Sequence, residues 1–105
     1  MDTQQGSLKI ATALISILKE HQIKLSSAIL FGSHTKGTAS PWSDIDLALV
    51  SEDFSGIPFY DRQKLNPFIL QVSSSLEIHP FRPEEFTTDN PFVAEIIQTG
   101  IPVPV

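Results

Sequence analysis

The amino-acid sequence predicts a small α/β (α+β) domain in which a β-sheet is backed by helices. Two observations support this fold class: short apolar runs typical of strands alternate with segments of helical periodicity, and glycine or proline separates most of them. The chain has 105 residues, which is enough for one domain with a modest core. We therefore expect residues 1–105 to form a single domain.

One helix and two strands are predicted in the first half of the chain. Residues 7–21 place apolar side chains at helical spacing, and Ser7 is a plausible N-cap. Residues 28–31 form a short apolar run that stops at Gly32, which predicts a buried strand. Residues 44–50 alternate clearly, so that the two aspartates lie on one face and the large aliphatic side chains on the other.

The connections in the middle of the chain are richer in turn-forming residues. Residues 33–36 are predicted to form a short helical turn, and residues 38–43 and 51–58 are predicted loops. Residues 59–74 show helical periodicity that Asn66–Pro67 interrupts. That pair predicts either a kink or a new helix that the asparagine caps and the proline begins.

The last third of the chain is predicted to hold one strand and two helical segments. Residues 76–81 alternate like a strand, and residues 83–86 suggest a single helical turn. Asn90 is expected to cap a helix that runs to Thr99, and residues 101–105 are too rich in proline for a central strand. The side chains expected to form core beneath that helix are Phe81, Phe86, Phe92, Ile96 and Ile97.

Composition and charge narrow the possible functions. The chain has no cysteine, which excludes disulfides and thiolate metal sites. Its net charge is −5 and no two of its seven Lys and Arg residues are adjacent, which argues against nucleic acid as a partner. The first residues lack a signal-peptide pattern and no apolar run could span a membrane, so we expect a cytoplasmic protein without a membrane partner.

Two aspartates on one strand are the strongest chemical signal. Asp44 and Asp46 leave the same strand face roughly 7 Å apart at the backbone. Two such carboxylates can converge on divalent ions bound about 3.5–4 Å apart. Mg²⁺ prefers a few carboxylate oxygens together with substrate phosphate oxygens. The pair therefore predicts a Mg²⁺ site that faces a phosphate group.

Gly32 and Ser33 supply a candidate phosphate site. Glycine lets a phosphate approach the backbone closely, and free N–H groups at the start of a helix attract anions. Taken singly, a Gly-Ser pair is common after a strand, and an Asp-x-Asp pair more often lies on a solvated face. The combination is more specific, because an apolar strand, Gly-Ser, ten residues, Asp-x-Asp and a second apolar strand follow one another.

The residues from Gly32 to Gly37, followed by Ser43 to Leu47, resemble the motif of the DNA polymerase beta-like nucleotidyltransferase superfamily. The resemblance is strongest to the minimal nucleotidyltransferases of bacteria and archaea. It implies a small mixed β-sheet flanked by helices. It also implies Mg²⁺-dependent transfer of a nucleoside monophosphate from a nucleoside triphosphate to an acceptor hydroxyl, with release of pyrophosphate.

The resemblance also assigns residues beyond the two aspartates. Family members normally add a third carboxylate from a neighbouring strand, and Glu77 is the candidate here, either to complete the metal shell or to act as general base. A solvated strand glutamate is the alternative. Lys36 stands where the family often has arginine, and it either contacts phosphate as a point charge or is a solvated lysine. His79 shares the face of Glu77 and is interpreted as a satisfied strand histidine.

The predicted site therefore combines catalytic and metal-binding residues with nucleotide-binding ones. They are Asp44, Asp46 and Glu77 for catalysis and metal, and Gly32, Ser33 and Lys36 for the nucleotide. Family members commonly occur with a helical HEPN-type partner, and some are antitoxins that adenylylate a tyrosine of that partner. The resemblance thus implies ATP as the donor and such a partner as the acceptor. The alternatives are a catalytically weak module that neutralises a partner by contact, and modification of a small molecule. The sequence is also compatible with a homo-oligomer.

Overall fold

The structure is a computed structural model that describes residues 3–32 and 44–105. The predicted turn at 33–36 and loop at 38–43 lie outside these residues. No helix in the described residues is long and apolar enough to cross a membrane. The elements in chain order are α1 (Thr3–Glu20), β1 (Ser27–Phe31), β2 (Ile45–Val50), α3 (Pro58–Val72), β3 (Leu76–Phe81), the 3-10 turn η1 (Pro83–Glu85), α4 (Pro91–Thr99) and β4 (Ile101–Pro102).

Four strands form one mixed sheet in the order β3-β2-β1-β4. β1 pairs antiparallel with both β2 and β4, whereas β2 and β3 are parallel. The parallel pair is possible because α3 lies between β2 and β3 in the chain and serves as the crossover that parallel neighbours require. The predicted small mixed sheet flanked by helices is confirmed.

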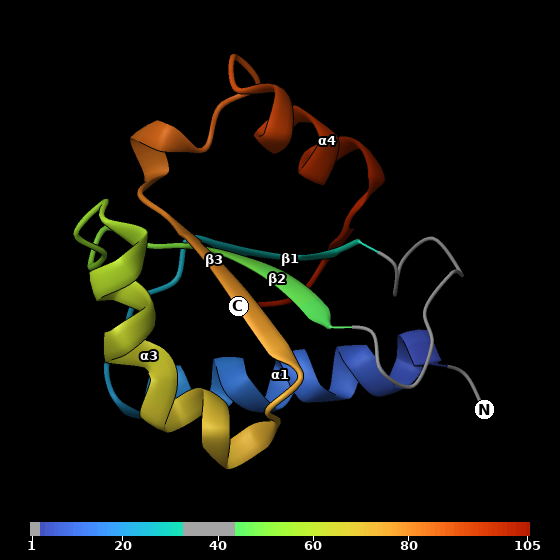
Figure 1. The fold of residues 1–105 in the computed structure, drawn as a ribbon, viewed down its shortest axis with the longest axis vertical. Coiled ribbons are helices and arrows are strands. Elements are labelled where there is room, and N and C mark those ends of the chain that lie inside the picture. Colours follow the sequence, from blue (N-terminus) through green and yellow to red (C-terminus); the bar gives the residue numbers. More distant parts are fainter. Residues whose placement is uncertain (1–2, 33–43) are drawn as a thin grey trace.

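The helices cover the two faces of the sheet in separate layers (Figure 1). α1 and α3 lie on one face, where the larger core gathers apolar residues of these helices and of β1, β2 and β3. α4 lies on the other face above a smaller cluster of Phe31, Ala48 and Ile96. Because strand side chains alternate, Ile45, Leu47 and Leu49 of β2 pack in the larger core, while Asp46 and Ala48 lie on the α4 face.

α4 and β4 end the described chain as the sequence predicts. The Asn90 side chain accepts a hydrogen bond from the Phe92 N–H at 2.9 Å, and Pro91 occupies the first helical turn. β4 is an edge strand that pairs with β1, and Pro102 lies opposite Ile29. An edge position tolerates a proline because its missing N–H removes no bond from the interior of the sheet.

One predicted helix start is wrong, and so is one of the two alternatives predicted at Asn66–Pro67. α1 begins at Thr3, so Ser7 is buried inside the helix instead of capping it. α3 continues from Pro58 to Val72 with Pro67 inside it, so Asn66–Pro67 does not begin a new helix. Leu65 and Ile69, on either side of that proline, are both buried in the larger core. Their packing keeps one helical face in contact with the core despite the hydrogen bond that a proline cannot make.

The predicted core beneath α4 is only partly confirmed. Ile96 is buried, but Phe92 and Ile97 are 43% and 45% exposed. A nine-residue helix on the sheet buries one narrow stripe, here Val93 and Ile96 at a spacing of three. Residues one position away, such as Ile97, must then face outward.

Candidate functional site

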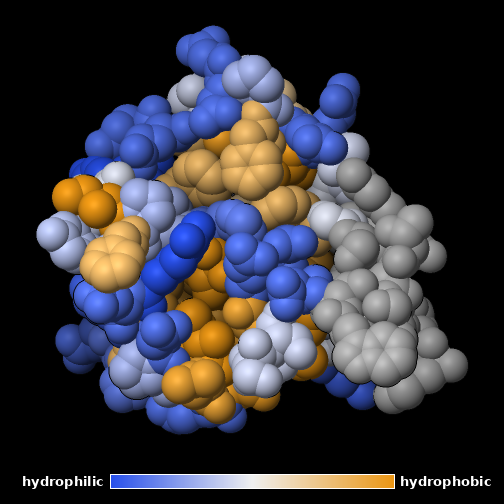
Figure 2. Space-filling model, in the orientation of Figure 1, coloured by the Kyte–Doolittle hydropathy of each residue, from blue (hydrophilic) through white to orange (hydrophobic). Residues whose placement is uncertain are grey.

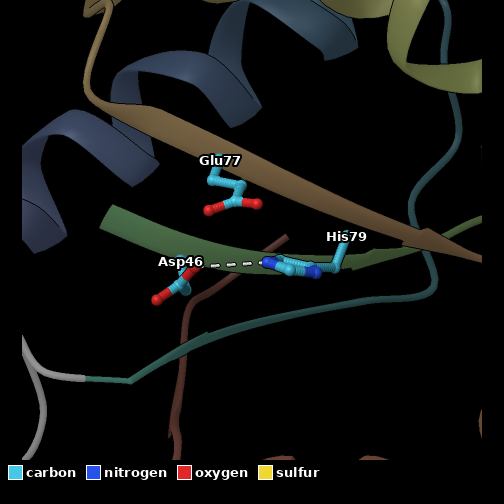
Figure 3. A group of neighbouring side chains, drawn as sticks. All are labelled: Asp46, Glu77 and His79. Carbon is cyan, nitrogen blue, oxygen red and sulfur yellow. Dashed lines mark hydrogen bonds and ion pairs between the residues drawn. The ribbon is translucent and has the colours of Figure 1, made fainter. Parts of the chain in front are cut away.

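The register of β2 and β3 brings two acidic side chains together. Asp46 lies directly opposite Glu77 in this parallel pair, and both lie on the α4 face of the sheet. Their carboxylates and the His79 imidazole each offer a ligand atom, and these atoms all lie within 4.8 Å of one another. Figure 3 shows the three side chains converging above the two strands. We call this group the triad.

His79 is in direct contact with Asp46. Its Nε2 lies 3.2 Å from Asp46 Oδ1, and the two side chains are 18% and 24% exposed. The imidazole is also held by ring contacts to Phe31 at 5.0 Å and to Phe92 at 5.8 Å between centroids, both in edge geometry. Aromatic rings favour such edge contacts, so His79 is fixed on the side that faces the acid. His79 is thus a strand histidine whose ring nitrogen is satisfied by Asp46.

Gly32 lies against the Asp46 carboxylate at the end of β1. The preceding residue, Phe31, pairs with Asp46 in the antiparallel register. Gly32 has φ +85°, and a Cβ built there would overlap Asp46 Oδ2. A glycine is thus required here for two reasons. Other residues rarely adopt this backbone conformation, and the carboxylate fills the space that a side chain would occupy. The sequence suggested only its value for phosphate approach.

The structure brings together some of the predicted site residues but not all. Asp46, Glu77 and Gly32 lie side by side. Asp44 is exposed and directly precedes β2. Among the described residues, it does not belong to the group whose ligand atoms lie within 4.8 Å of one another. Ser33 and Lys36 fall outside the described residues. His79 is the residue that the sequence did not assign, although its position two residues after Glu77 on the same strand face was a usable signal.

The triad presents two carboxylates and one imidazole on a partly exposed surface. Asp46 and His79 are partly buried and Glu77 is exposed, so a ligand can reach all three. Carboxylate oxygens are the ligands that Mg²⁺ and Mn²⁺ prefer, and neutral imidazole binds divalent transition metals. A cation would also offset the repulsion between two neighbouring carboxylates. The donor set therefore fits a divalent metal ion.

Apolar surface lies close to the triad. Phe92 contacts the His79 ring, and its side chain also approaches Phe81 at 6.4 Å between centroids. Figure 2 shows apolar surface below α4, bordered by polar side chains. The triad thus lies beside exposed aromatic surface, an arrangement that suits a ligand with both a charged and a flat apolar part.

Comparison with known proteins defines the class of this domain. The model of the nucleotidyltransferase domain family matches residues 12–102, so the chain belongs to that family. The protein is accordingly a nucleotidyltransferase enzyme by class. A search of curated proteins found no match.

Solved structures share the fold. A candidate nucleotidyltransferase from Sulfolobus solfataricus superposes with a TM-score of 0.66 and 19% identity, covering 95% of this chain and 81% of that one. A toxin–antitoxin crystallised with AMP-PNP gives 0.63 and 23% identity, over 87% of this chain and 69% of that one. A mutant of the toxin–antitoxin MntA–HpeT gives 0.59 and 21% identity, over 85% and 68%. At these identities the likeness establishes the fold.

Proposed function

We propose that this domain transfers AMP from ATP to an acceptor hydroxyl with the help of Mg²⁺. The observation that carries the proposal is the position of Asp46 and Glu77, which lie opposite each other on β2 and β3 beside the Gly32 turn. In a nucleotidyltransferase domain, these two carboxylates would hold a divalent metal, which would supply positive charge near the phosphates of a bound nucleotide.

The proposed roles divide between two groups of residues. Asp44, Asp46 and Glu77 hold Mg²⁺, which neutralises charge on the phosphates when bound. Gly32, Ser33 and Lys36 hold the triphosphate, through backbone N–H groups, a hydroxyl and a positive charge. Each predicted site residue thus has a proposed contact with either the metal or the nucleotide.

The bond changes follow from these roles. The acceptor oxygen attacks the α-phosphorus, and its proton passes to a carboxylate, for which Glu77 is the exposed candidate. A new bond forms between that oxygen and the α-phosphorus. The bond from the α-phosphorus to the bridging oxygen breaks, and pyrophosphate leaves. Placing the acceptor and the triphosphate in line would supply much of the rate.

The proposed acceptor is a tyrosine of a helical HEPN-type partner protein in the cytoplasm, so that this domain acts as an antitoxin. Two solved structures that share the fold are toxin–antitoxin assemblies, one of them with the ATP analogue AMP-PNP. The exposed Phe92 beside His79 offers an aromatic surface on which a tyrosine ring could pack while its hydroxyl reaches the triad. The net charge of −5 also favours a protein acceptor over nucleic acid.

Transfer of label tests this proposal. The purified protein is incubated with Mg²⁺, ATP labelled at the α-phosphate and the protein encoded next to it, and label on that protein is measured. We expect label with the wild type, a loss of about 10²-fold or more for Asp46→Asn, and no loss for the matched control Asp89→Asn, an exposed aspartate that is not part of the triad. Equal labelling by Asp46→Asn and the wild type would reject the proposed role.

One observation supports the second candidate, a module that neutralises its partner by contact. His79 engages one oxygen of Asp46, which could keep the acid from a metal in a site that no longer turns over. Under that alternative Asp46→Asn still protects cells that produce the partner. Under the proposed enzyme function, protection and labelling are lost together.

A further inference from the structure

His79 adds a nitrogen donor to the site, which neither the sequence motif nor the family match assigns. Its Nε2 faces Asp46 Oδ1 at 3.2 Å, and a Glu77 oxygen lies within 4.8 Å of the other donors (Figure 3). Within the triad, the close contact of His79 is with Asp46. It leaves the neighbouring carboxylate of Glu77 without a compensating charge in this group, which a shared cation would supply.

The spacing of the donor atoms suits ligands of one ion. Ligand atoms lie about 2.1 Å from a small divalent cation, so adjacent ligands in an octahedral shell are about 3 Å apart and opposite ones about 4.2 Å. The 3.2 Å between Nε2 and Oδ1 matches adjacent positions. All three donor atoms lie within 4.8 Å of one another, which is close to the separation of opposite ligands in such a shell.

The imidazole is also held in place by aromatic rings on two sides. Phe31 and Phe92 contact its ring at interplanar angles of 60° and 62°, so the ring is packed from β1 and from α4. Phe31 is in turn the residue opposite Asp46 in the strand register. A ligand fixed in this way loses little side-chain entropy when a metal binds.

We propose that His79 is a direct metal ligand through Nε2, and that it makes the site prefer a first-row transition ion such as Mn²⁺ or Co²⁺ over Mg²⁺. The inference rests on the proposed function, because it concerns the same carboxylates. Mg²⁺ takes oxygen ligands almost exclusively, whereas imidazole nitrogen strengthens binding of transition ions. One nitrogen beside two carboxylates therefore shifts the selectivity of the site without closing it to substrate.

Metal selectivity tests the proposal without any need for turnover. Affinities of the intact protein for Co²⁺ and Mg²⁺ are measured by calorimetry for the wild type, His79→Gln and the control His21→Gln. Glutamine keeps an N–H donor for Asp46 but removes the imidazole, and His21 is exposed at the end of α1, against Phe68. We expect the ratio of Co²⁺ to Mg²⁺ affinity to fall about tenfold or more in His79→Gln and to stay unchanged in His21→Gln.

A spectroscopic measurement on the wild type covers the case in which His79→Gln fails to fold. Pulsed electron paramagnetic resonance of the Mn²⁺-loaded protein should show coupling to an imidazole nitrogen. Absence of that coupling, or an unchanged affinity ratio in a folded His79→Gln, overturns the assignment of His79. If neither ion binds the wild type, the metal site of the proposed function fails as well. If metal binds through His79 but no label is transferred, only the proposed function fails.

Discussion

The Asp46 carboxylate fills the space that a side chain at Gly32 would need. A Cβ built on Gly32 overlaps Asp46 Oδ2, and the glycine backbone has φ +85°. The conformation of the turn after β1 and the position of the Asp46 carboxylate on β2 therefore depend on each other. This contact connects a local backbone requirement to the orientation of a side chain that we place in the metal site.

Replacing Gly32 should therefore damage both the fold and the site. Gly32→Ala forces either the backbone or the Asp46 carboxylate to move, and a left-handed conformation alone costs a non-glycine residue about 1–2 kcal/mol. We expect unfolding by urea at lower concentration, and weaker Co²⁺ binding than in the wild type. Gly6→Ala is the matched control, because nothing lies within 4 Å of its added Cβ and alanine favours the α1 helix. Equal Co²⁺ binding by Gly32→Ala and the wild type would show that the contact does not orient the acid.

Glu77→Gln should separate stability from function. Like charges directly opposite each other in a sheet are destabilising, and Glu77 lies opposite Asp46. Without metal, the variant should thus be slightly more stable than the wild type in urea unfolding. With ATP and a divalent ion, its transfer of label should fall by about 10²-fold or more, as expected when a general base or metal ligand is lost.

The control for this change is Glu20→Gln, an exposed position at the end of α1. It removes the same charge and should leave transfer unaltered. If Glu77→Gln transfers label as well as Glu20→Gln does, then Glu77 is the solvated strand residue that the sequence also allowed.

Much of the fold could be predicted from the sequence because several helices and strands have characteristic local residue patterns. The alternation of residues 44–50 predicted both β2 and the face on which Asp46 lies. The Asn90–Pro91 pair predicted the start of α4. The predictions that Ser7 caps a helix and that a new helix begins at Pro67 were wrong, because capping and helix-breaking preferences are only tendencies. Burial of α1 and α3 against the sheet outweighed them.

The site was less predictable because it depends on strand register. Asp46 and Glu77 are far apart in the chain, and only the parallel pairing of β2 with β3 places them opposite each other. The contact of His79 with Asp46 follows from the same register and from the aromatic rings of Phe31 and Phe92. None of these contacts leaves a periodic pattern along the sequence. A pattern identifies the face of a strand, but not the neighbour beside it.

Acid should weaken a contact that anchors the end of β3. Arg82 Nε donates to Glu84 Oε2 at 2.6 Å, and this hydrogen bond holds the pKa of Glu84 below its ordinary value of 4.5. Because the pKa is lower in the folded protein, the pair stabilises the fold above that ordinary value. The stabilisation is lost as the pH falls through the folded pKa.

The measurement is the urea midpoint of the wild type and of Glu84→Gln as a function of pH. We expect a small excess for the wild type at pH 7 that disappears as the pH falls below 4.5, and that shrinks in high salt because the pair is on the surface. A gap that stays constant across this range would mean that the carboxylate charge does not contribute.

Removing the proline inside α3 should stabilise the protein. Pro67 is exposed in the interior of a helix that runs from Pro58 to Val72, so its position lacks a backbone N–H that could donate to Gln63. Pro67→Ala restores that donor and a residue of high helix propensity. The gain is partly offset because alanine gives the unfolded chain more freedom, so we expect a net increase of about 1–2 kcal/mol in the free energy of unfolding.

Pro91→Ala is the control for this prediction, since a proline in the first turn of α4 occupies a position whose N–H has no partner within the helix. It should bring no such gain. Urea unfolding of both variants, with the slope of the transition compared with the wild type, makes the measurement. A loss of stability in Pro67→Ala would show that the rigidity of the proline matters more to the native chain than the missing hydrogen bond. The β2–α3–β3 crossover, which sets the register of Asp46 and Glu77, would then depend on a stiffened helix.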